Sequence, residues 1–303
     1  MKNNATWVTG VYPLVSMVII NFEGINHTFE LINSLKEVDY PNFEILVVDN
    51  GSQPSEADLI SKKYPEICVI RSNNNLGYAG GCNLGAKYCS GKYYFFLNND
   101  LIVDKNFLRP CVEMAEKKKY VGAINPKILY YDNPDVIQYA GYTSFSRILI
   151  RNKSIGYNCS DGSGFGEDRE IPTFIGTAMM IPSWTFDHVG HVNEDYFLYY
   201  EEHEWSSRMK KKGYRFYLVG DSKIYHKGSA TTGKNSPQKE YYLLKNRIRF
   251  ARLCETNFFL FSFLYLSFGV GAKKYIEFRR NKKYQHAKMI LKAIYDSRIY
   301  FKS

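Results

Sequence analysis

The sequence predicts an α/β protein built on a mostly parallel, doubly wound sheet with helices on both faces. Two observations carry this prediction: apolar runs of strand length alternate with helix-length segments over residues 14–97, and three of the runs end in polar clusters. The chain has 303 residues, 45% of them hydrophobic, which is enough to bury one large domain or two smaller ones. Disorder and collagen-like repetition are excluded, and folding requires neither disulfides nor a structural metal.

Four apolar runs are predicted as buried strands and three intervening segments as helices. The segment after the first run carries apolar residues at helical spacing until Pro41 and its polar neighbours break the pattern. The predicted strands are 14–21, 43–48, 67–71 and 93–97, and the predicted helices are 27–38, 56–63 and 79–89. This alternation favours a parallel sheet.

The predicted strands bring three polar groups to one edge of the sheet. Asn21 ends the first strand, Asp49-Asn50-Gly51-Ser52 follows the second, and Asn98-Asn99-Asp100 follows the fourth. Ligands of open α/β sheets bind beyond the carboxyl ends of the strands. One such group alone is more often a turn or a helix cap, but three in successive units indicate a ligand-binding site.

A glycine-rich turn at 71–85 leads from the third strand into the next helix. A dinucleotide-binding fingerprint would instead place G-x-G-x-x-G directly after the first strand, with an acid about 20 residues further on. The segment after the first strand, Asn21-Phe-Glu-Gly-Ile-Asn26, holds one glycine. NAD binding is therefore disfavoured.

The net charge of +10 is concentrated at the C-terminal end. Residues 241–303 hold fourteen Lys or Arg and three acids, a net +11, which leaves residues 1–240 at −1. The apolar, aromatic run 258–272 is shorter than the roughly 20 residues that span a bilayer, and the basic segment 273–283 follows it. Two interpretations stay open: an interfacial helix that contacts an anionic membrane, or a core-packing or dimer-forming helix with a solvated basic face.

Cysteine usage and the N-terminal segment indicate the compartment. The six cysteines are scattered without a C-x-x-C pair, which predicts reduced thiols in a cytosolic protein. The first apolar stretch, 15–20, is too short for the apolar region of a signal peptide. We therefore expect a cytoplasmic protein, which an interfacial helix would bring to the inner face of the cell membrane.

Seven motifs follow one another between residues 14 and 250. They are Val15-Ser-Met-Val-Ile-Ile-Asn21, Tyr40-Pro-Asn-Phe-Glu-Ile-Leu-Val-Val-Asp-Asn-Gly-Ser52, Asn75-Leu-Gly-Tyr-Ala-Gly-Gly81, Phe96-Leu-Asn-Asn-Asp100, Phe197-Leu-Tyr-Tyr-Glu-Glu202, Ile224-Tyr-His226 and Tyr241-Tyr-Leu-Leu-Lys-Asn-Arg247. In this order they resemble the family 2 glycosyltransferases, the inverting group with the GT-A fold, and most closely its rhamnosyltransferase-like bacterial branch. The resemblance implies a GT-A catalytic domain at 1–240, with a nucleotide-sugar-binding half at about 14–110 and an acceptor-binding half at 111–240. A basic, aromatic helical extension at 241–303 would follow it.

The same resemblance implies how the donor is held. Asn98-Asn99-Asp100 stands where the family has D-x-D, so Asp100 is the implied metal ligand, and His226 aligns with a histidine that many GT-A enzymes add. Without the family, a strand-end histidine making one hydrogen bond is equally expected. A carboxylate with an imidazole suits Mn²⁺ or Mg²⁺, which would stabilise the diphosphate leaving group. Asp49 lies where the family hydrogen-bonds a pyrimidine base. The implied nucleotide-sugar-binding residues are Asn21, Asp49, Asn50, Arg71, Asn75, Gly77, Asn99 and Asp100.

The segment Glu201-Glu-His-Glu204 occupies the place of the family's E-D-x-D motif, whose second acid is the usual base. The implied base is Glu202, which would take the proton of the acceptor hydroxyl as that hydroxyl attacks the anomeric carbon. Because this chain departs from the motif, Glu201, His203 or Glu204 could share the role; in isolation the segment is typical of a solvated helix start. The acceptor side is expected to include Gly176, Thr177, Tyr200 and Trp205, the aromatic residues as walls of a cleft.

We therefore expect an inverting glycosyltransferase acting from a pyrimidine nucleotide-diphosphate sugar, such as dTDP-rhamnose or a UDP-sugar. Its acceptor would be a hydroxyl of a glycan or lipid-linked glycan in bacterial surface polysaccharide synthesis. A sugar nucleotidyltransferase would need a basic glycine-rich loop near the first strand, which Asn21-Phe-Glu-Gly24 lacks. A nucleic-acid-binding protein acting through the basic tail would leave the polar strand ends unexplained, so no nucleic-acid partner is expected.

Overall fold

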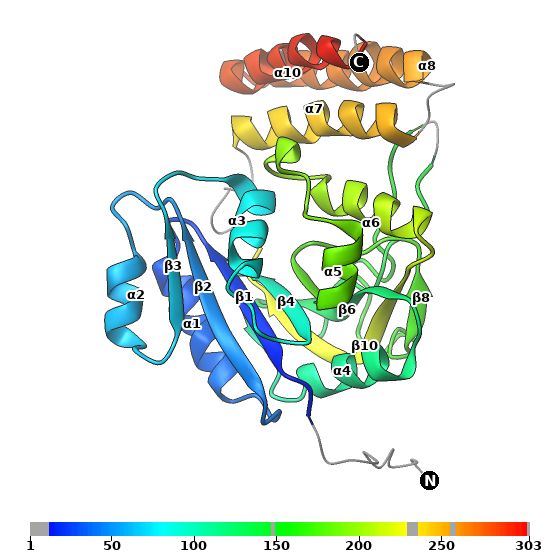
Figure 1. Cartoon of the computed structure of the whole chain (residues 1–303). Helices are drawn as coiled ribbons and strands as arrows, with labels where there is room; N and C mark the ends of the chain where they lie inside the picture. The colour runs from blue at the N-terminus through cyan, green and yellow to red at the C-terminus, as the bar shows by residue number, and fades with distance from the viewer. Residues whose placement is uncertain (1–11, 147–148, 229–235, 255–258, 302–303) are drawn as a thin grey trace.

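The computed structural model describes residues 12–146, 149–228, 236–254 and 259–301 (Figure 1). One sheet of ten strands forms the core of the protein. The strands are β1 (Val15–Asn21), β2 (Phe43–Asn50), β3 (Cys68–Ser72), β4 (Tyr93–Asn98), β5 (Leu101–Val103), β6 (Val121–Tyr130), β7 (Ile137–Tyr139), β8 (Arg169–Ile171), β9 (Ala178–Pro182) and β10 (Arg215–His226). Their order is β3-β2-β1-β4-β9-β6-β10-β5, with β7 paired to β6 and β8 to β10.

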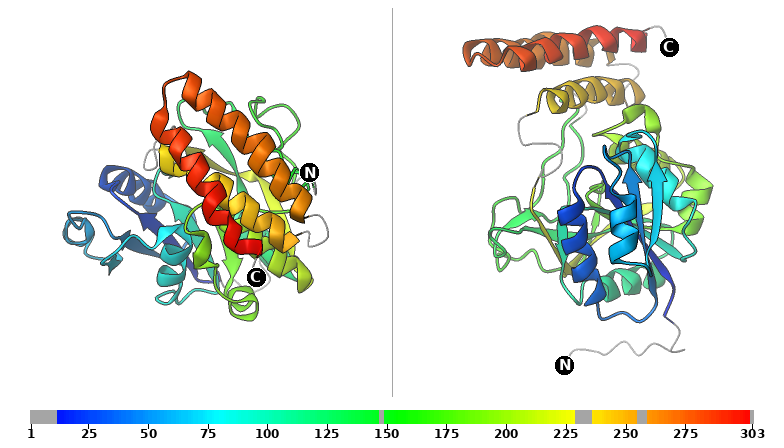
Figure 2. Two further views of the ribbon diagram at one scale, coloured as in Figure 1. Left: turned by 90° about the horizontal axis from the view of Figure 1, so that it is seen from above. Right: turned by 90° about the vertical axis from the view of Figure 1, so that its left-hand side faces the viewer.

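Helices cover both faces of the sheet and form a separate layer at the C-terminal end. They are α1 (Ile25–Lys36), α2 (Ala57–Lys63), α3 (Gly77–Ala86), α4 (Leu108–Lys117), α5 (Ser183–Val189), η1 (Glu194–Tyr196), α6 (Glu201–Lys211), α7 (Pro237–Cys254), α8 (Phe259–Leu264), η2 (Tyr265–Gly271), α9 (Ala272–Arg280), α10 (Tyr284–Asp296) and η3 (Ser297–Phe301). Figure 2 shows α1 on one face of the sheet and α3 on the other. The predicted fold class is confirmed.

The N-terminal half of the sheet is parallel. β2 and β4 flank β1, and their registers place Asn21 beside Asp49 and Ile20 beside Asn98. Each predicted strand and helix is present, with ends shifted by at most three residues. The expected meeting of the polar strand ends at one edge of the sheet is therefore confirmed.

The second half of the sheet mixes directions and brings a distant residue to the same edge. β9 pairs antiparallel with β4, and β10 runs parallel to β6. β5 returns antiparallel along β10, and this pairing places His226 beside Leu101, the residue after Asp100. The two predicted metal ligands therefore meet through strand pairing, although 126 positions separate them in the sequence.

Two ion pairs that share Asp161 connect the loop before β8 to the sheet. The Lys127 ammonium on β6 is 2% exposed and lies 2.5 Å from Asp161 Oδ1, while Lys223 on β10 lies 2.6 Å from Oδ2. Burial opposes ionisation of Asp161, but the two ammonium groups outweigh burial and lower the pKa of its carboxyl. The stabilisation is therefore present above the pKa of an unfolded Asp, about 3.9, and is lost as the pH falls through the lowered folded-state value.

Asp161→Asn should lower the free energy of unfolding by about 3–5 kcal/mol, because Lys127 would stay buried without an anion. Urea unfolding at pH 7 measures this loss. Lys223→Gln is the control; its side chain is 37% exposed, so it should cost less than about 1 kcal/mol. Equal losses in both variants would contradict the assigned role of the buried lysine.

The C-terminal helices form two stacked tiers on one side of the sheet domain (Figure 2). α7 lies against the domain, and the chain from α8 through η2 and α9 runs antiparallel beside α10 above it. The predicted domain boundary after residue 240 falls inside α7, which begins at Pro237. None of the helices in the described ranges combines the length and apolar character needed to cross a membrane. Phe258, the first residue of the predicted apolar run, lies outside the described residues.

The core is apolar and continuous across the sheet. Every residue of β1 is buried, as expected for a central parallel strand.

The five cysteines whose side chains are described are free thiols, in agreement with the sequence: Cys68, Cys82, Cys89, Cys111 and Cys159.

Candidate active site

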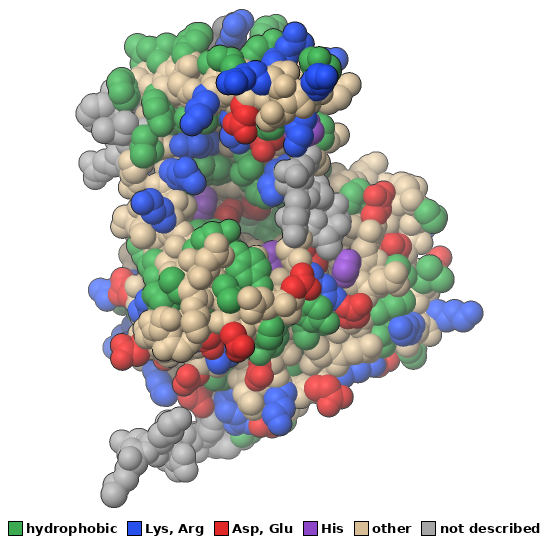
Figure 3. Space-filling model, turned by 180° about the vertical axis from the view of Figure 1, so that it is seen from behind, with side chains coloured by type: hydrophobic (Ala, Val, Ile, Leu, Met, Phe, Trp, Pro, Cys, Tyr) green, Lys and Arg blue, Asp and Glu red, His purple; other side chains and the backbone are tan. Residues whose placement is uncertain are grey.

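A cleft of about 610 Å³ lies between the carboxyl ends of the strands and helix α7. Figure 3 shows the surface hollowed below the C-terminal helices. Residues at or directly after the ends of four strands line it: Ile20 of β1, Asn50 of β2, Asn98, Asn99 and Asp100 at the end of β4, and His226 of β10. The position agrees with the general rule for ligand sites in open α/β sheets.

Asp100 and His226 face each other inside this cleft. Asp100 Oδ1 lies 3.3 Å from His226 Nε2, and both side chains are largely buried. Gln138 Oε1 on β7 lies 2.6 Å from His226 Nδ1, and in the tautomer with its proton on Nδ1 this nitrogen donates to the amide oxygen. The lone pair of Nε2 then points toward a carboxylate oxygen. Two acceptors facing each other at this distance fit a shared cation.

The protein offers this cation two strong ligands. Within the part of the chain that the structure describes, no three His, Cys, Asp or Glu side chains converge on one point. Mg²⁺ is commonly held by one or two carboxylates together with substrate phosphates, and Mn²⁺ accepts the same oxygen and imidazole ligands. The residues present therefore fit a divalent ion whose remaining ligands come from a diphosphate.

Five of the predicted donor residues line the cleft. They are Asn50, Asn75, Gly77, Asn99 and Asp100. Gly77 has a φ of +70°, and a Cβ there would lie 2.2 Å from the carbonyl oxygen of Phe197, so only glycine fits. The Asn50 side chain donates to the Gly77 carbonyl at 3.0 Å and accepts from the Leu76 amide at 3.2 Å. This residue therefore positions the glycine turn at the wall of the cleft.

The other three predicted donor residues do not line the cleft. Asp49 is fully buried, and its Oδ2 accepts from Ser55 Oγ at 2.8 Å and from the Glu56 and Ala57 amides at 2.9 and 3.1 Å. This carboxylate therefore holds the start of α2. Asn21 is also fully buried, bonded to Thr28, Glu56 and Asn99, and Arg71 is exposed on the surface. Their predicted contacts with the nucleotide stay predictions.

The first turn of α6 presents two adjacent acids in different environments. Glu201 is buried, and burial together with the charge of Glu202 raises the pKa of its carboxyl well above the usual range. This shift favours the protonated form of Glu201 beside an ionised Glu202. Oε2 of Glu202 is buried and has no hydrogen-bond partner among the described residues, and the same is true of Oε2 of Glu201. An unsatisfied carboxylate oxygen is costly to bury and typical of a functional group.

The cleft wall lies next to Glu202. An added Cβ at Gly176 would lie 3.7 Å from Glu202 Cβ, and the next residue, Thr177, lines the cleft. Tyr78, another lining residue, donates its hydroxyl to the Gly176 carbonyl, and burial, with both acids adding, raises its pKa far above the usual value. Tyr78 is not among the predicted site residues, although it stands in the Asn75-Leu-Gly-Tyr78 motif.

The other two residues of the acidic segment have structural partners. Glu204 forms an ion pair with Arg208 at 2.8 Å, one helical turn further on. His203 is buried, which lowers the pKa of its imidazole and keeps it neutral, and its Nδ1 lies 3.2 Å from Thr173 Oγ1. Its Nε2 lies 3.7 Å from Glu202 Oε1, too far for a hydrogen bond. The role of Glu202 as the base stays a prediction.

The predicted aromatic cleft walls need a correction. Trp205 is fully buried, donates to the Gly190 carbonyl at 2.9 Å and packs edge-on against Phe174 and Phe186. It is a core residue, because position 205 on α6 points into the sheet domain, and it is not among the described residues that line the cleft of about 610 Å³. Tyr200 packs against His203 and Phe250 and does not line the cleft of about 610 Å³. Phe197 and Tyr199, which stand four and two residues before Glu201, line it instead.

The loop before the acids is held in an unfavourable backbone conformation. Phe197, Tyr199 and Tyr200 have φ values of 56°, 68° and 75°, which non-glycine residues rarely adopt. The buried Asn246 side chain on α7 donates to the carbonyls of Tyr196, Leu198 and Tyr199 at 2.6, 2.8 and 2.9 Å. Strained residues persist where surrounding contacts determine them, and they cluster at active sites. α7 is therefore part of the site, and Asn246 is a positioning residue.

Asn246→Ala should lower kcat at least about tenfold, since small displacements of catalytic groups are costly. It should also lower the free energy of unfolding by about 1–3 kcal/mol, because three carbonyls lose their donor. Steady-state kinetics and urea unfolding measure the two effects. Asn281→Ala, at an exposed position after α9, is the control and should change neither. An unchanged kcat in a destabilised Asn246→Ala protein would reduce the residue to a purely structural role.

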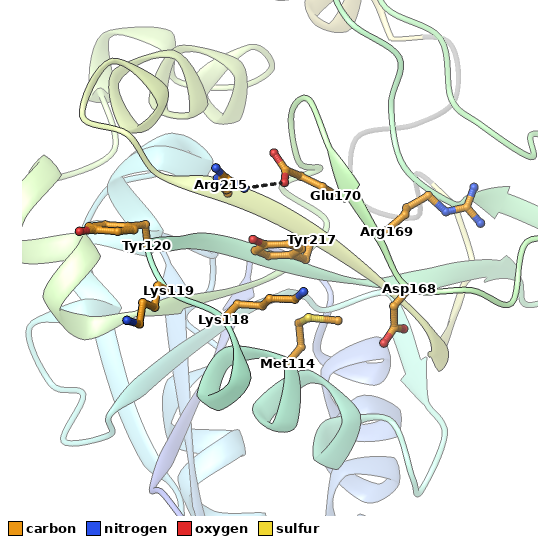
Figure 4. Close-up of a pocket in the computed structure, with 9 residues that line it drawn as sticks. All are labelled: Met114, Lys118, Lys119, Tyr120, Asp168, Arg169, Glu170, Arg215 and Tyr217. Carbon is orange, nitrogen blue, oxygen red and sulfur yellow. Dashed lines mark hydrogen bonds and ion pairs between the residues drawn. The ribbon is translucent and has the colours of Figure 1, made fainter. Parts of the chain in front are cut away.

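A second cavity lies at the opposite ends of the strands. It has a volume of about 450 Å³ and is lined by residues that include Lys118, Tyr120, Glu170, Arg215 and Tyr217, near the amino ends of β6 and β10. Figure 4 shows Arg215 paired with Glu170 across it, at 3.5 Å. None of the predicted site residues lines this cavity.

Solved structures of glycosyltransferases have the same fold. GalNAc-T7 with UDP, GalNAc and Mn²⁺ has a TM-score of 0.60 at 18% identity, covering 77% of this chain and 48% of that chain. The mannosyltransferase PcManGT from Pyrobaculum calidifontis, in complex with GDP-Man and Mn²⁺, has a TM-score of 0.57 at 14% identity, covering 96% of this chain and 76% of that chain. At these identities the likeness shows the fold alone.

Sequence relatives include glycosyltransferases of bacteria and archaea. An uncharacterised glycosyltransferase of Rickettsia prowazekii is 31% identical over 192 residues, covering 60% of this chain and 54% of the relative. The low-salt glycan biosynthesis hexosyltransferase of Haloferax volcanii is 28% identical over 202 residues, covering 65% of this chain and 62% of the relative. The O-antigen biosynthesis protein of Myxococcus xanthus is 24% identical over 253 residues, covering 76% of this chain and 19% of the relative. The chain thus spans little more than half the length of the first two relatives.

The sequence model of glycosyl transferase family 2 matches residues 16–169. This match covers just over half of the chain and includes β1, β2 and β4, whose carboxyl ends line the cleft. The chain therefore belongs to glycosyl transferase family 2.

Proposed function

We propose that this protein transfers a sugar, with inversion, from a nucleotide-diphosphate donor to a hydroxyl group of a glycan acceptor. One observation carries the proposal: in a member of glycosyl transferase family 2, a facing carboxylate and imidazole lie in a cleft at the strand ends, and an unsatisfied carboxylate adjoins its wall. The first pair suits a diphosphate with its cation. The second group suits proton removal from an attacking hydroxyl.

Each group then has one task. Asp100 and His226 would hold Mn²⁺ or Mg²⁺, which when bound neutralises charge on the leaving diphosphate. Gln138 keeps the proton of His226 on Nδ1 and so leaves Nε2 as a ligand. Glu202 accepts the proton of the acceptor hydroxyl. Burial and the charge of Glu202 raise the pKa of the Glu201 carboxyl, so in this scheme Glu201 is protonated and adds no second negative charge beside the base.

The donor nucleotide is proposed to carry a pyrimidine base, as in dTDP-rhamnose or a UDP-sugar. The support is the resemblance to the family, which places Asp49 where the imide hydrogen of uracil or thymine is accepted. In the structure this carboxylate is buried and bonded to the start of α2, so the proposal requires it to turn toward the base. The two solved structures contain UDP and GDP-Man respectively, so their likeness does not choose between bases.

UDP and dTDP should therefore raise the melting temperature more than GDP and ADP do, with Mn²⁺ present throughout. Ligands stabilise the state that binds them, so a thermal-shift series ranks the four nucleotides. Equal protection by all four would remove Asp49 from base recognition while leaving the diphosphate site intact.

The reaction itself is tested by incubating the protein with a nucleotide sugar and a glycan acceptor and separating the products. A transferase releases nucleoside diphosphate, and proton NMR of the new glycoside should show the anomeric configuration opposite to that of the donor. A sugar nucleotidyltransferase would instead release pyrophosphate from a nucleoside triphosphate and a sugar phosphate. Retention of configuration would contradict the role of Glu202 as a base.

The acceptor is proposed to be a glycan or lipid-linked glycan of bacterial surface polysaccharide synthesis, made at the cytoplasmic side of the membrane. The names of two relatives, a glycan biosynthesis hexosyltransferase and an O-antigen biosynthesis protein, support this assignment. At identities of 28% and 24%, these relatives support a proposal about the class of acceptor and not about the linkage that is formed.

A further inference from the structure

Large apolar side chains are exposed on the outermost tier of helices, on the side that faces away from α7. Phe268 is 71% exposed and Tyr295 is 65% exposed. They belong to a set of exposed apolar residues on α8, η2, α9, α10 and η3, which we call the outer face: Leu260, Phe261, Leu264, Phe268, Ile276, Leu291, Tyr295 and Ile299. Contiguous exposed apolar surface of this kind marks an interaction site.

The spacing shows that these residues form stripes. Leu260, Leu264, Phe268 and Ile276 recur at multiples of four along the continuous helical segment, and Leu291, Tyr295 and Ile299 do so on α10 and η3. Residues between them, such as Phe263, Leu266 and Ile290, are buried in the cluster that includes Ile248 of α7. Figure 2 shows the two helical segments side by side, so their stripes lie in one tier.

Basic side chains surround the stripes. Residues 259–301 carry nine Lys or Arg and two acids, and one of those acids, Asp296, accepts a hydrogen bond from Tyr241. Exposed basic residues among them are Lys273, Arg279, Arg280, Lys282, Lys283, Lys288, Lys292 and Arg298. Figure 3 shows Lys and Arg interspersed with apolar side chains over this end of the molecule.

We propose that the outer face docks on an anionic lipid membrane, with the helices lying in the plane of the interface. Apolar side chains would enter the boundary between headgroups and acyl chains, while Lys and Arg contact anionic headgroups. The charge decides the occupant: two copies of this chain meeting through the same face would bring two strongly basic surfaces together, whereas an anionic membrane complements them. A membrane also buries the apolar stripes, which a purely electrostatic partner would leave in water.

Docking in this way has a geometric consequence for the cleft. Tyr242 of α7 lines the cleft from one side, and the outer tier packs on the other side of α7. The cleft would therefore open beneath the docked helices. The docking proposal rests on the surface alone and is independent of the proposed transfer reaction, because vesicle binding is measured without donor or acceptor.

Flotation with lipid vesicles tests the proposal. The full chain should float with vesicles of phosphatidylcholine and phosphatidylglycerol and bind pure phosphatidylcholine vesicles at least about tenfold more weakly. Binding to the anionic vesicles should weaken as salt is raised, because screening shortens the reach of the headgroup charges.

Three variants separate the contributions. The first variant removes basic charge and should lower the partition coefficient on anionic vesicles at least about tenfold; it is Lys282→Gln/Lys283→Gln/Lys288→Gln/Lys292→Gln. The second variant removes the apolar area that the membrane would bury and should lower the partition coefficient by a similar factor; it is Leu264→Ser/Phe268→Ser/Tyr295→Ser. The matched control, Lys118→Gln/Lys119→Gln/Tyr120→Ser, changes exposed basic and aromatic residues at the second cavity and should bind as the parent does. Circular dichroism confirms that each variant is folded.

Several outcomes would overturn the proposal. Failure of the parent to float with anionic vesicles would do so, as would an equal loss in the control. Sedimentation showing a dimer that Leu264→Ser/Phe268→Ser/Tyr295→Ser dissociates, without flotation of the parent, would assign the face to a second copy of the chain. A salt-dependent shift of RNA or DNA without vesicle binding would assign the basic residues to nucleic acid.

Discussion

Glu202→Gln should slow sugar transfer by about 10²–10⁴-fold, the usual contribution of a general base. The amide keeps the size of the side chain but accepts no proton, so donor nucleotide affinity should match that of the parent. Single-turnover measurements with saturating donor give the transfer rate, and calorimetric titration with nucleoside diphosphate gives the affinity.

Glu201→Gln is the matched control for this prediction. Burial and the charge of Glu202 raise the pKa of the Glu201 carboxyl and favour its protonated form, so an uncharged amide of the same shape should change little. The loss of transfer should be much smaller than in Glu202→Gln. If Glu201→Gln abolishes transfer while Glu202→Gln retains most of it, the base is the other acid and the alignment of Glu201-Glu-His-Glu204 with the family motif is wrong by one position.

Asp100→Asn should reduce transfer by at least about 10²-fold, because losing a carboxylate ligand removes several kcal/mol of leaving-group stabilisation. The side chain keeps its size, so the fold should remain intact. The independent readout is binding: Mn²⁺ should strengthen nucleoside diphosphate binding to the parent and have little effect on the variant. Asp187→Asn, an exposed acid on α5, is the control and should keep both properties. Normal turnover of Asp100→Asn with saturating Mn²⁺ would remove Asp100 from the metal site.

The sequence predicts the parallel half of the sheet well because each strand there is coded locally. Apolar runs such as 43–48 end in polar residues, and parallel pairing then brings Asn21 beside Asp49 without further information. The second half is different. β5, β7 and β8 have three residues each, which is too short for a hydrophobic pattern to indicate, and β9 joins β4 in the antiparallel direction.

Candidate site residues were found by position along strands, and the errors lie in side-chain direction. Sequence places Asp49 at a strand end, but it does not show that the carboxylate turns toward the start of α2 and away from the cleft. It likewise places Trp205 after the acidic segment without showing that one helical turn directs the ring into the core. Gln138 and Asn246 were missed because their partners, His226 and the 196–199 carbonyls, lie 47 or more positions away.

Hydrogen exchange with mass spectrometry tests most directly whether the cleft at the strand ends is the nucleotide-sugar site. UDP or GDP with Mn²⁺ should slow exchange in peptides that cover Asn75–Tyr78, Asn98–Asp100 and Gln238–Tyr242, which line the cleft. Peptides covering Lys118–Tyr120 and Arg169–Glu170 at the second cavity should exchange as in the free protein. Protection at the second cavity with none at the strand ends would contradict the assignment of the active site.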